Sequence, residues 1–277
     1  VGVTSALAMT YVTLGEYEKL TGKTIEEFNE APMLRTMVAA GELPPVEERL
    51  PEDPFVVVPI DRIGIYGGTA HVATNFTTAP VGSLWGVGWG HYVRSNITAA
   101  KVELNFAKRV EVSKDKTTFT IYLRRGVKWS DGVPFTADDP MFWYTDVLHN
   151  KELTPVIGGH WEGVKVQKLD DYTIQIKTPG PRPYFLEYPI SKGRPNGSYN
   201  IPKHYLKQFH PKYTAEEELK KRVEEAGFDY WYELFWKKNT RYHQLPVDTE
   251  CPTLASYVPV KITSSQRVFE RNPYYWK

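Results

Sequence analysis

The segment Leu123–Tyr144, LRRGVKWSDGVPFTADDPMFWY, carries the densest set of structural signals in this 277-residue sequence. The residues before it, 117–123, alternate apolar and polar side chains and predict a half-buried strand. Ser130–Gly132 predicts a turn. Thr136–Pro140 has the capping residue, the acidic first turn and the early proline that start a helix. A strand, a turn and an aromatic helix in this order indicate a mixed α/β (α+β) fold.

Other segments are consistent with that fold class. Leu104–Val112 and Thr117–Leu123 predict one hairpin, Val164–Lys168 and Tyr172–Lys177 predict another, and Ala255–Glu270 holds a last strand or pair. Apolar spacing and capping residues predict helices in the following segments: Leu14–Phe28 with a second start at Thr24, Met33–Gly41, Met141–His149, Ile201–Phe209, Thr214–Ala226 and Phe228–Trp236. Leu43–Pro59, with five prolines, is expected to be an extended surface connector, and Gly67-Gly68 to precede a strand at Thr69–Thr74.

Charge and composition exclude several classes of protein. Lys and Arg number 34 against 33 Asp and Glu, so no basic field favours a nucleic-acid partner. No apolar run is long enough for a membrane-spanning helix. The single cysteine, Cys251, can form neither an internal disulfide nor a thiolate metal site. Val1–Ala8 reads equally well as the tail of a secretory signal or as an ordinary N-terminus.

No motif for catalysis is present. The sequence lacks a G-x-S-x-G elbow, an H-E-x-x-H helix, a phosphate-binding P-loop and a dinucleotide fingerprint. The seven histidines show no spacing typical of metal ligands. Asp138 and Asp139 are adjacent, so on a helix their side chains point about 100° apart and cannot flank one bond. We therefore expect no catalytic residue, no metal site and no cofactor.

Five segments carry a resemblance to a known family. Tyr122–Tyr144 resembles the oligopeptide/dipeptide-type extracellular solute-binding proteins of ABC importers, known as family 5, and four further segments are similar to that family in the same order: Ala31–Pro59, Lys165–Pro183, Ile201–Pro211 and Phe269–Lys277. Pro140 departs from the pattern, since the family usually has an aliphatic residue there. In the family, the motif at Phe269–Lys277 leads into a second lobe.

The resemblance implies a fold and a domain division. It predicts the first lobe of a periplasmic-binding-protein type II-like fold, with a mixed sheet, flanking helices and hairpins. Residues 1–59 are expected to form an N-terminal helical and extended segment, and residues 60–277 the first solute-binding lobe. The family binds its ligand between two lobes, so contacts made by the second lobe cannot be assigned to residues of this sequence.

The resemblance also implies a function. The full-length protein is expected to be a monomeric receptor, periplasmic or extracellular, that captures a peptide or an oligosaccharide and delivers it to a membrane permease. The alternative is a lobe fragment that acts as a protein-interaction module without a solute.

The predicted ligand-binding residues lie mainly in one loop. That loop, Phe76–Tyr92, is rich in tryptophan and glycine and borders the cleft by analogy with the family. Its aromatic side chains could equally be packing residues. The predicted set is Phe76, Thr77, Thr78, Trp85 and Trp89 from this loop, together with Trp161.

Overall fold

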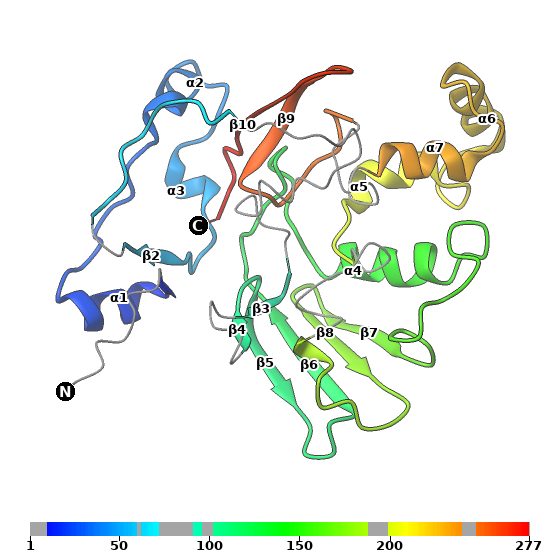
Figure 1. Ribbon diagram of the computed structural model, residues 1–277, viewed down its shortest axis with the longest axis horizontal. Coiled ribbons are helices and arrows are strands. Elements are labelled where there is room, and N and C mark those ends of the chain that lie inside the picture. The colour runs from blue at the N-terminus through cyan, green and yellow to red at the C-terminus, as the bar shows by residue number, and fades with distance from the viewer. Residues whose placement is uncertain are drawn as a thin grey trace.

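The largest sheet of the described residues has four antiparallel strands and lies at the lower end of the molecule in Figure 1. The structure is a computed structural model that describes residues 10–59, 62–71, 91–95, 102–187, 199–239 and 248–276. The sheet has the order β5-β6-β8-β7, with β5 at Ala107–Val112, β6 at Thr118–Leu123, β7 at Lys165–Asp170 and β8 at Thr173–Lys177. Both predicted hairpins are therefore confirmed, and β6 and β8 join them into one sheet.

Alternating burial explains why these strands pair in this register. On β6, Phe119, Ile121 and Leu123 are buried while the residues between them are half-exposed. Phe119 lies opposite Ile176 of β8, and Ile121 lies opposite Ile174. A shift of one residue would turn this apolar face to solvent, so the register is strongly specified.

The helix of the Leu123–Tyr144 segment packs over the sheet (Figure 1). It begins as α4, Asp138–Phe142, and continues as a π-helix, η3, at Trp143–Leu148. The prediction of a helix up to His149 is confirmed, but the change to π-helical hydrogen bonding was not predicted. The N-cap residue is Ala137, which offers no side-chain acceptor. The Thr136 backbone N–H instead donates to Oδ2 of Asp139 at 3.1 Å.

Four further helical elements lie beyond α4, in the order α5 (Lys203–Leu206), η5 (Lys207–Phe209), α6 (Glu216–Glu225) and α7 (Trp231–Lys238). The predicted amphipathic helix α6 buries Leu219 and Val223 and ends before Gly227. Thr214 does not cap it as predicted, because the Thr214 hydroxyl donates to the carbonyl of Gln208 at 3.0 Å.

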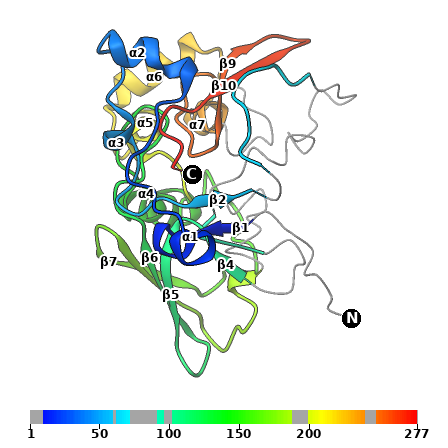
Figure 2. The same ribbon diagram turned by 90° about the vertical axis from the view of Figure 1, so that its left-hand side faces the viewer.

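The N-terminal segment lies along one side of the molecule (Figure 2). It contains β1 (Thr10–Val12), α1 (Leu14–Thr21), the 3₁₀-helix η1 (Pro32–Leu34), α2 (Arg35–Ala39), α3 (Val46–Arg49) and β2 (Val56–Val58). Strands β1 and β2 pair with each other. A second helix starting at Thr24 was wrong: the capping box forms between Thr13 and Glu16, and the Thr24 hydroxyl donates to Glu18.

The expectation for Leu43–Pro59 was also wrong. This segment contains α3 and β2, and Leu43, Arg49 and Phe55 in it are buried. The prolines favoured an extended connector, but the apolar side chains between them reach the core. Phe55 joins the main core, where its ring centroid lies 5.5 Å from that of Trp276. The N-terminal segment thus packs against the C-terminal part of the described chain.

Four short strands complete the fold. β3 (Val93–Ser95) pairs with β4 (Val102–Leu104), and β9 (Tyr257–Ile262) pairs with β10 (Arg267–Arg271) as predicted. The predicted strand at Thr69–Thr74 is not formed over residues 69–71, and its remainder lies outside the described residues. The molecule is a mixed α/β protein, and the division at residue 59 stays a prediction.

Candidate functional site

Trp161 is the one predicted site residue in the described part of the chain. Phe76, Thr77, Thr78, Trp85 and Trp89 fall within residues 72–90, outside the described residues. Trp161 is 7% exposed and belongs to the main core. The residues around Trp161 are therefore the described part of the predicted site.

Trp161 lies within a group of five large rings, which we call the aromatic cluster: Tyr92, Trp143, Trp161, Phe185 and Tyr199. The ring centroid of Trp161 is 4.8 Å from that of Trp143, 5.7 Å from Phe185 and 6.2 Å from Tyr199. Tyr92 and Tyr199 stack at 4.8 Å with an interplanar angle of 25°. These are the edge-to-face and offset-stacked distances at which aromatic pairs attract.

Each ring of the cluster comes from a different element. Tyr92 directly precedes β3, and Trp143 is the first residue of the π-helix. Trp161 lies in the turns between that helix and β7, Phe185 follows β8, and Tyr199 precedes α5. π-helical segments occur often at functional sites. The loop predicted to bind ligand, Phe76–Tyr92, has its last residue in this cluster.

Sequence reasoning missed Trp143, Phe185 and Tyr199 as neighbours of Trp161. The three consecutive aromatics Phe142–Tyr144 were a visible signal, but a helix buries some of its aromatic residues and exposes others. Phe142 points elsewhere, with its ring 5.9 Å from Tyr213. Only the packing of α4 and η3 selects Trp143 for the cluster.

The hydroxyl of Tyr92 is an unusual polar group. Its ring is 1% exposed, and the hydroxyl has no hydrogen-bond partner within the described residues. Burial raises the pKa of Tyr92, and the nearby Tyr199 and Asp139 raise it further. A buried donor without an acceptor costs about 1–3 kcal/mol, so this hydroxyl is suited to an acceptor supplied from outside the described residues.

A buried carboxylate, Asp139, lies close to the cluster. It is 4% exposed and accepts the Trp129 indole N–H at 3.3 Å and the Lys203 backbone N–H at 3.1 Å. Burial raises its pKa to about 6, although these hydrogen bonds and the nearby His204 act in the opposite direction. Asp139 is thus more than the helix cap that its position in the sequence predicted.

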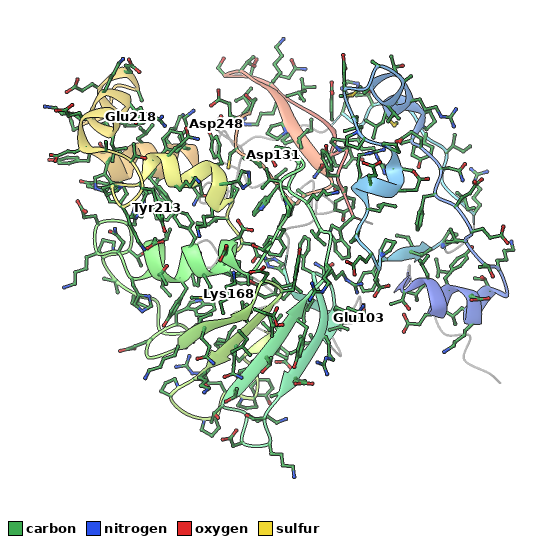
Figure 3. The ribbon with its side chains drawn as sticks, turned by 180° about the vertical axis from the view of Figure 1, so that it is seen from behind. Glu103, Asp131, Lys168, Tyr213, Glu218 and Asp248 are labelled. Carbon is green, nitrogen blue, oxygen red and sulfur yellow. The ribbon has the colours of Figure 1, made fainter. Side chains whose placement is uncertain are left out.

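A second polar group surrounds Asp146 on the π-helix. Its carboxylate accepts from Lys212 at 2.6 Å and from the hydroxyl of Tyr213 at 2.5 Å, and Figure 3 labels Tyr213 near these helices. Burial would raise the pKa of Asp146, but the two hydrogen bonds and the charges of Lys212 and His210 together lower it. Because both carboxylate oxygens of Asp146 accept hydrogen bonds from these residues, Asp146 connects η3 to the residues that precede α6.

The described residues offer little for other chemistry. They contain no group of three or more His, Cys, Asp or Glu side chains that could hold a metal ion. Two cavities, of about 320 and 400 Å³, lie beside the N-terminal segment and at the ends of β5 and β6. Neither cavity is lined by a residue of the aromatic cluster. No helix of the described part is long and apolar enough to cross a membrane.

Comparison with known proteins defines the class. Residues 101–277, more than half of the chain, match the family model described as bacterial extracellular solute-binding proteins, family 5 middle. The chain therefore belongs to the family 5 extracellular solute-binding proteins. The resemblance carried by Tyr122–Tyr144 and the fold class are thereby confirmed.

Individual relatives agree with this family. A periplasmic alpha-galactoside-binding protein of Rhizobium meliloti (strain 1021) is 31% identical over 97% of this chain. A solved oligopeptide-binding protein OppA is 39% identical over 95% of the chain, with a TM-score of 0.83. The periplasmic binding protein MelB of Agrobacterium fabrum C58, solved with stachyose, is 28% identical over 92%, with a TM-score of 0.67. The chain spans 39%, 41% and 39% of these three proteins, respectively.

Proposed function

We propose that this chain forms one wall of the binding cleft of an ABC-importer receptor that captures peptides or oligosaccharides. The observation that carries the proposal is the aromatic cluster in a member of family 5, together with the Tyr92 hydroxyl, for which the described residues supply no hydrogen-bond partner. Ligand sites in such receptors combine aromatic walls with a few polar groups that fix orientation. The predicted contacts are Phe76, Thr77, Thr78, Trp85, Trp89 and Trp161, to which Tyr92 is added.

The named relatives support both solute classes. Two are described as binding alpha-galactosides or stachyose, and one as binding oligopeptides. Tryptophan and tyrosine rings suit either solute, because their faces stack on sugar rings and also pack against peptide side chains. The partner in import is a membrane permease, and the place of action is the periplasm or the outer cell surface. Binding and release are non-covalent, with no catalytic step and no cofactor.

Titration calorimetry of the purified chain with stachyose, and separately with a nonapeptide, tests the proposal. We expect Trp85→Ala and Trp89→Ala to weaken the affinity for the solute that binds. The matched control is Tyr257→Ala, an exposed aromatic residue of β9 outside the cluster. If affinity is unchanged in both tryptophan variants, the loop does not contact the solute. If neither solute binds, either to this chain or to a chain of the relatives' full length, the receptor function is wrong.

One observation favours the second candidate, a protein-interaction module. Ile63 and Ile65 are 81% and 86% exposed, and Tyr66 is 53% exposed, in an extended stretch beside β10. Contiguous exposed apolar side chains typically mark a protein contact. Light scattering distinguishes the two candidates: a monomeric chain that binds solute supports the receptor, whereas a self-associating chain without solute affinity supports the interaction module.

A further inference from the structure

Asp139 connects its own part of the chain, the turn after β6 and the start of α4, to the start of α5, 64 residues further along the sequence. Its Oδ2 atom accepts the Trp129 indole N–H at 3.3 Å and the Thr136 backbone N–H at 3.1 Å. Its Oδ1 atom accepts the backbone N–H of Lys203, the first residue of α5, at 3.1 Å. The side chain is 4% exposed, so these three donors replace its hydration. Asp139 therefore ties the turn after β6 to the starts of α4 and α5.

The segment held by Asp139 forms part of the aromatic cluster. The residues just before α5 are buried: Tyr199, Asn200 and Ile201 are 3%, 1% and 0% exposed. Only Pro202 separates them from Lys203. Tyr199 stacks on Tyr92, and its ring centroid is 6.1 Å from that of Trp143. The hydrogen bond from the Lys203 N–H to Asp139 thus fixes the backbone four residues after Tyr199. Loss of this hydrogen bond would therefore affect the position of Tyr199 in the cluster.

Protonation changes what Asp139 can accept. An ionised carboxylate has only acceptors and here meets three N–H donors, whereas a protonated carboxyl group adds a fourth donor to the same site. Oδ2 receives two N–H groups and Oδ1 receives one, so Oδ1 is the less occupied oxygen for a proton. A proton at Oδ1 competes with the Lys203 N–H, which then loses its buried acceptor.

The charged groups around Asp139 are paired with one another. Nε2 of His204, on α5, lies 2.8 Å from Oδ2 of Asp131. Asp131 belongs to the turn after β6 and is labelled in Figure 3. On α4, the adjacent Asp138 accepts from Lys168 of β7 at 2.9 Å, and Lys168 also pairs with Asp171. The charge of Asp139 raises the pKa of Tyr92, which precedes β3, and the charge of Lys203 lowers the pKa of Asp138. Among these groups, Asp139 is the carboxylate held entirely by uncharged donors.

From this geometry we infer that Asp139 is a positioning residue for solute binding, and that only its ionised form holds the Tyr199 wall of the aromatic cluster in place. The inference rests on the proposed function, because it takes the aromatic cluster to be the binding wall. Since burial raises the pKa of Asp139 to about 6, the change falls within mildly acidic pH. Solute affinity therefore decreases as the surroundings acidify.

Three chains test the inference: the wild-type chain, Asp139→Asn, and the matched control Asp138→Asn. The control makes the same chemical change one residue earlier, at a half-exposed carboxylate that bonds Lys168. Near-ultraviolet circular dichroism of the solute-free chains is recorded between about pH 7.5 and about pH 5, and it reports the packing of Trp129 and the cluster rings. Calorimetry with stachyose and with a nonapeptide follows at both pH values.

We expect the wild-type chain and Asp138→Asn to show a spectral transition near pH 6 that Asp139→Asn lacks. We also expect solute affinity about tenfold weaker at the lower pH in the first two chains, as for one lost hydrogen bond to a buried charge. In Asp139→Asn the affinity should be independent of pH, because an amide does not titrate there. The same transition in all three chains, or its absence from the wild-type chain, overturns the inference.

Two further outcomes are informative. If neither solute binds at either pH, the proposed function fails, and the spectral transition alone decides whether Asp139 holds the Tyr199 wall. If Asp139→Asn does not fold, the variant with both His91→Gln and His204→Gln replaces it. The His91 ring centroid lies 6.4 Å from that of Tyr199, and His204 acts on Asp139 electrostatically. A transition retained in that variant supports Asp139, and its loss overturns the inference.

Discussion

Arg124 is an example of a single residue that joins distant parts of the chain. It is 2% exposed, and its guanidinium donates to the carbonyl oxygens of Asn105 at 2.9 Å and Asp53 at 2.7 Å. The same group stacks over the ring of Phe55 at 3.8 Å. Arg124 therefore attaches the N-terminal segment to the end of β6. The next residue, Arg125, is exposed.

Replacing Arg124 with methionine should destabilise the fold. The change leaves the carbonyl oxygens of Asn105 and Asp53 without their donor, whereas the Asp53 carboxylate keeps Lys108 at 3.7 Å. Loss of a buried charged hydrogen-bond donor costs about 3 kcal/mol. Urea unfolding measures the difference. Arg125→Met is the matched control and should change the free energy of unfolding by less than about 0.5 kcal/mol. Equal effects of the two changes would contradict the role of Arg124.

The raised pKa of Asp139 predicts a pH dependence of stability. The pKa is about 6 in the folded chain, against an ordinary value of 3.8. Between these values the folded chain binds more protons than the unfolded chain, so the contribution of Asp139 to stability falls as the pH rises from about 4 to about 6. The full change is about 3 kcal/mol. It should appear as a difference between the unfolding curves of the wild-type chain and Asp139→Asn, and parallel curves across this range would contradict it.

At the scale of elements, the turn between β6 and α4 is fixed by the C-terminal part of the described chain. The Ser130 backbone N–H donates to the carbonyl of Thr253 at 3.0 Å, and the Thr253 N–H donates to the Ser130 hydroxyl at 3.0 Å. Gly132 has φ of 87° and faces the ring of Tyr274. The turn within Tyr122–Tyr144 therefore contacts Phe269–Lys277 through Tyr274.

Gly132→Ala should cost more stability than Gly227→Ala. Both glycines have positive φ, and an alanine in this conformation costs about 1 kcal/mol. A Cβ atom at Gly132 would also lie 2.9 Å from the Cζ and Oη atoms of Tyr274, while at Gly227 it would meet nothing within 4 Å. We expect about 1 kcal/mol of additional loss at Gly132. Urea unfolding of both variants measures it, and equal losses would show that the turn does not pack tightly on Tyr274.

At the scale of the whole molecule, the side chains of Ile63 and Ile65 are exposed to solvent, whereas the rings of the aromatic cluster are buried. The cluster rings are buried by elements from across the chain, whereas Ile63 and Ile65 are more than 80% exposed. Such exposure favours self-association when nothing covers it. In a chain that self-associates, the double change Ile63→Ser and Ile65→Ser should therefore lower the apparent mass in light scattering, with no loss of thermal stability. An unchanged mass would show that this stretch is not a contact surface.

Elements whose buried side chains recur at short sequence intervals could be predicted from the sequence. The hairpins β5–β6 and β7–β8, the helix α6 and the pair β9–β10 follow from alternation or helical spacing within about a dozen residues. The errors lie where distant contacts override local preference. Thr24 would cap a helix, yet its hydroxyl bonds back to Glu18, and the proline-rich Leu43–Pro59 is folded onto the core by Phe55. The five predicted loop residues at 76–89 stay predictions.

The amino-acid sequence alone was sufficient for the family, for the pairs β5–β6, β7–β8 and β9–β10, and for the amphipathic helix α6. These depend on side chains close together in the chain, whose polar and apolar order is visible as a pattern. The aromatic cluster and the Asp139 connection required the folded chain, because their members are spread from residue 92 to residue 203 and meet through packing. Hydrophobic burial is not directional, so a sequence shows which side chains leave water without showing which ones meet.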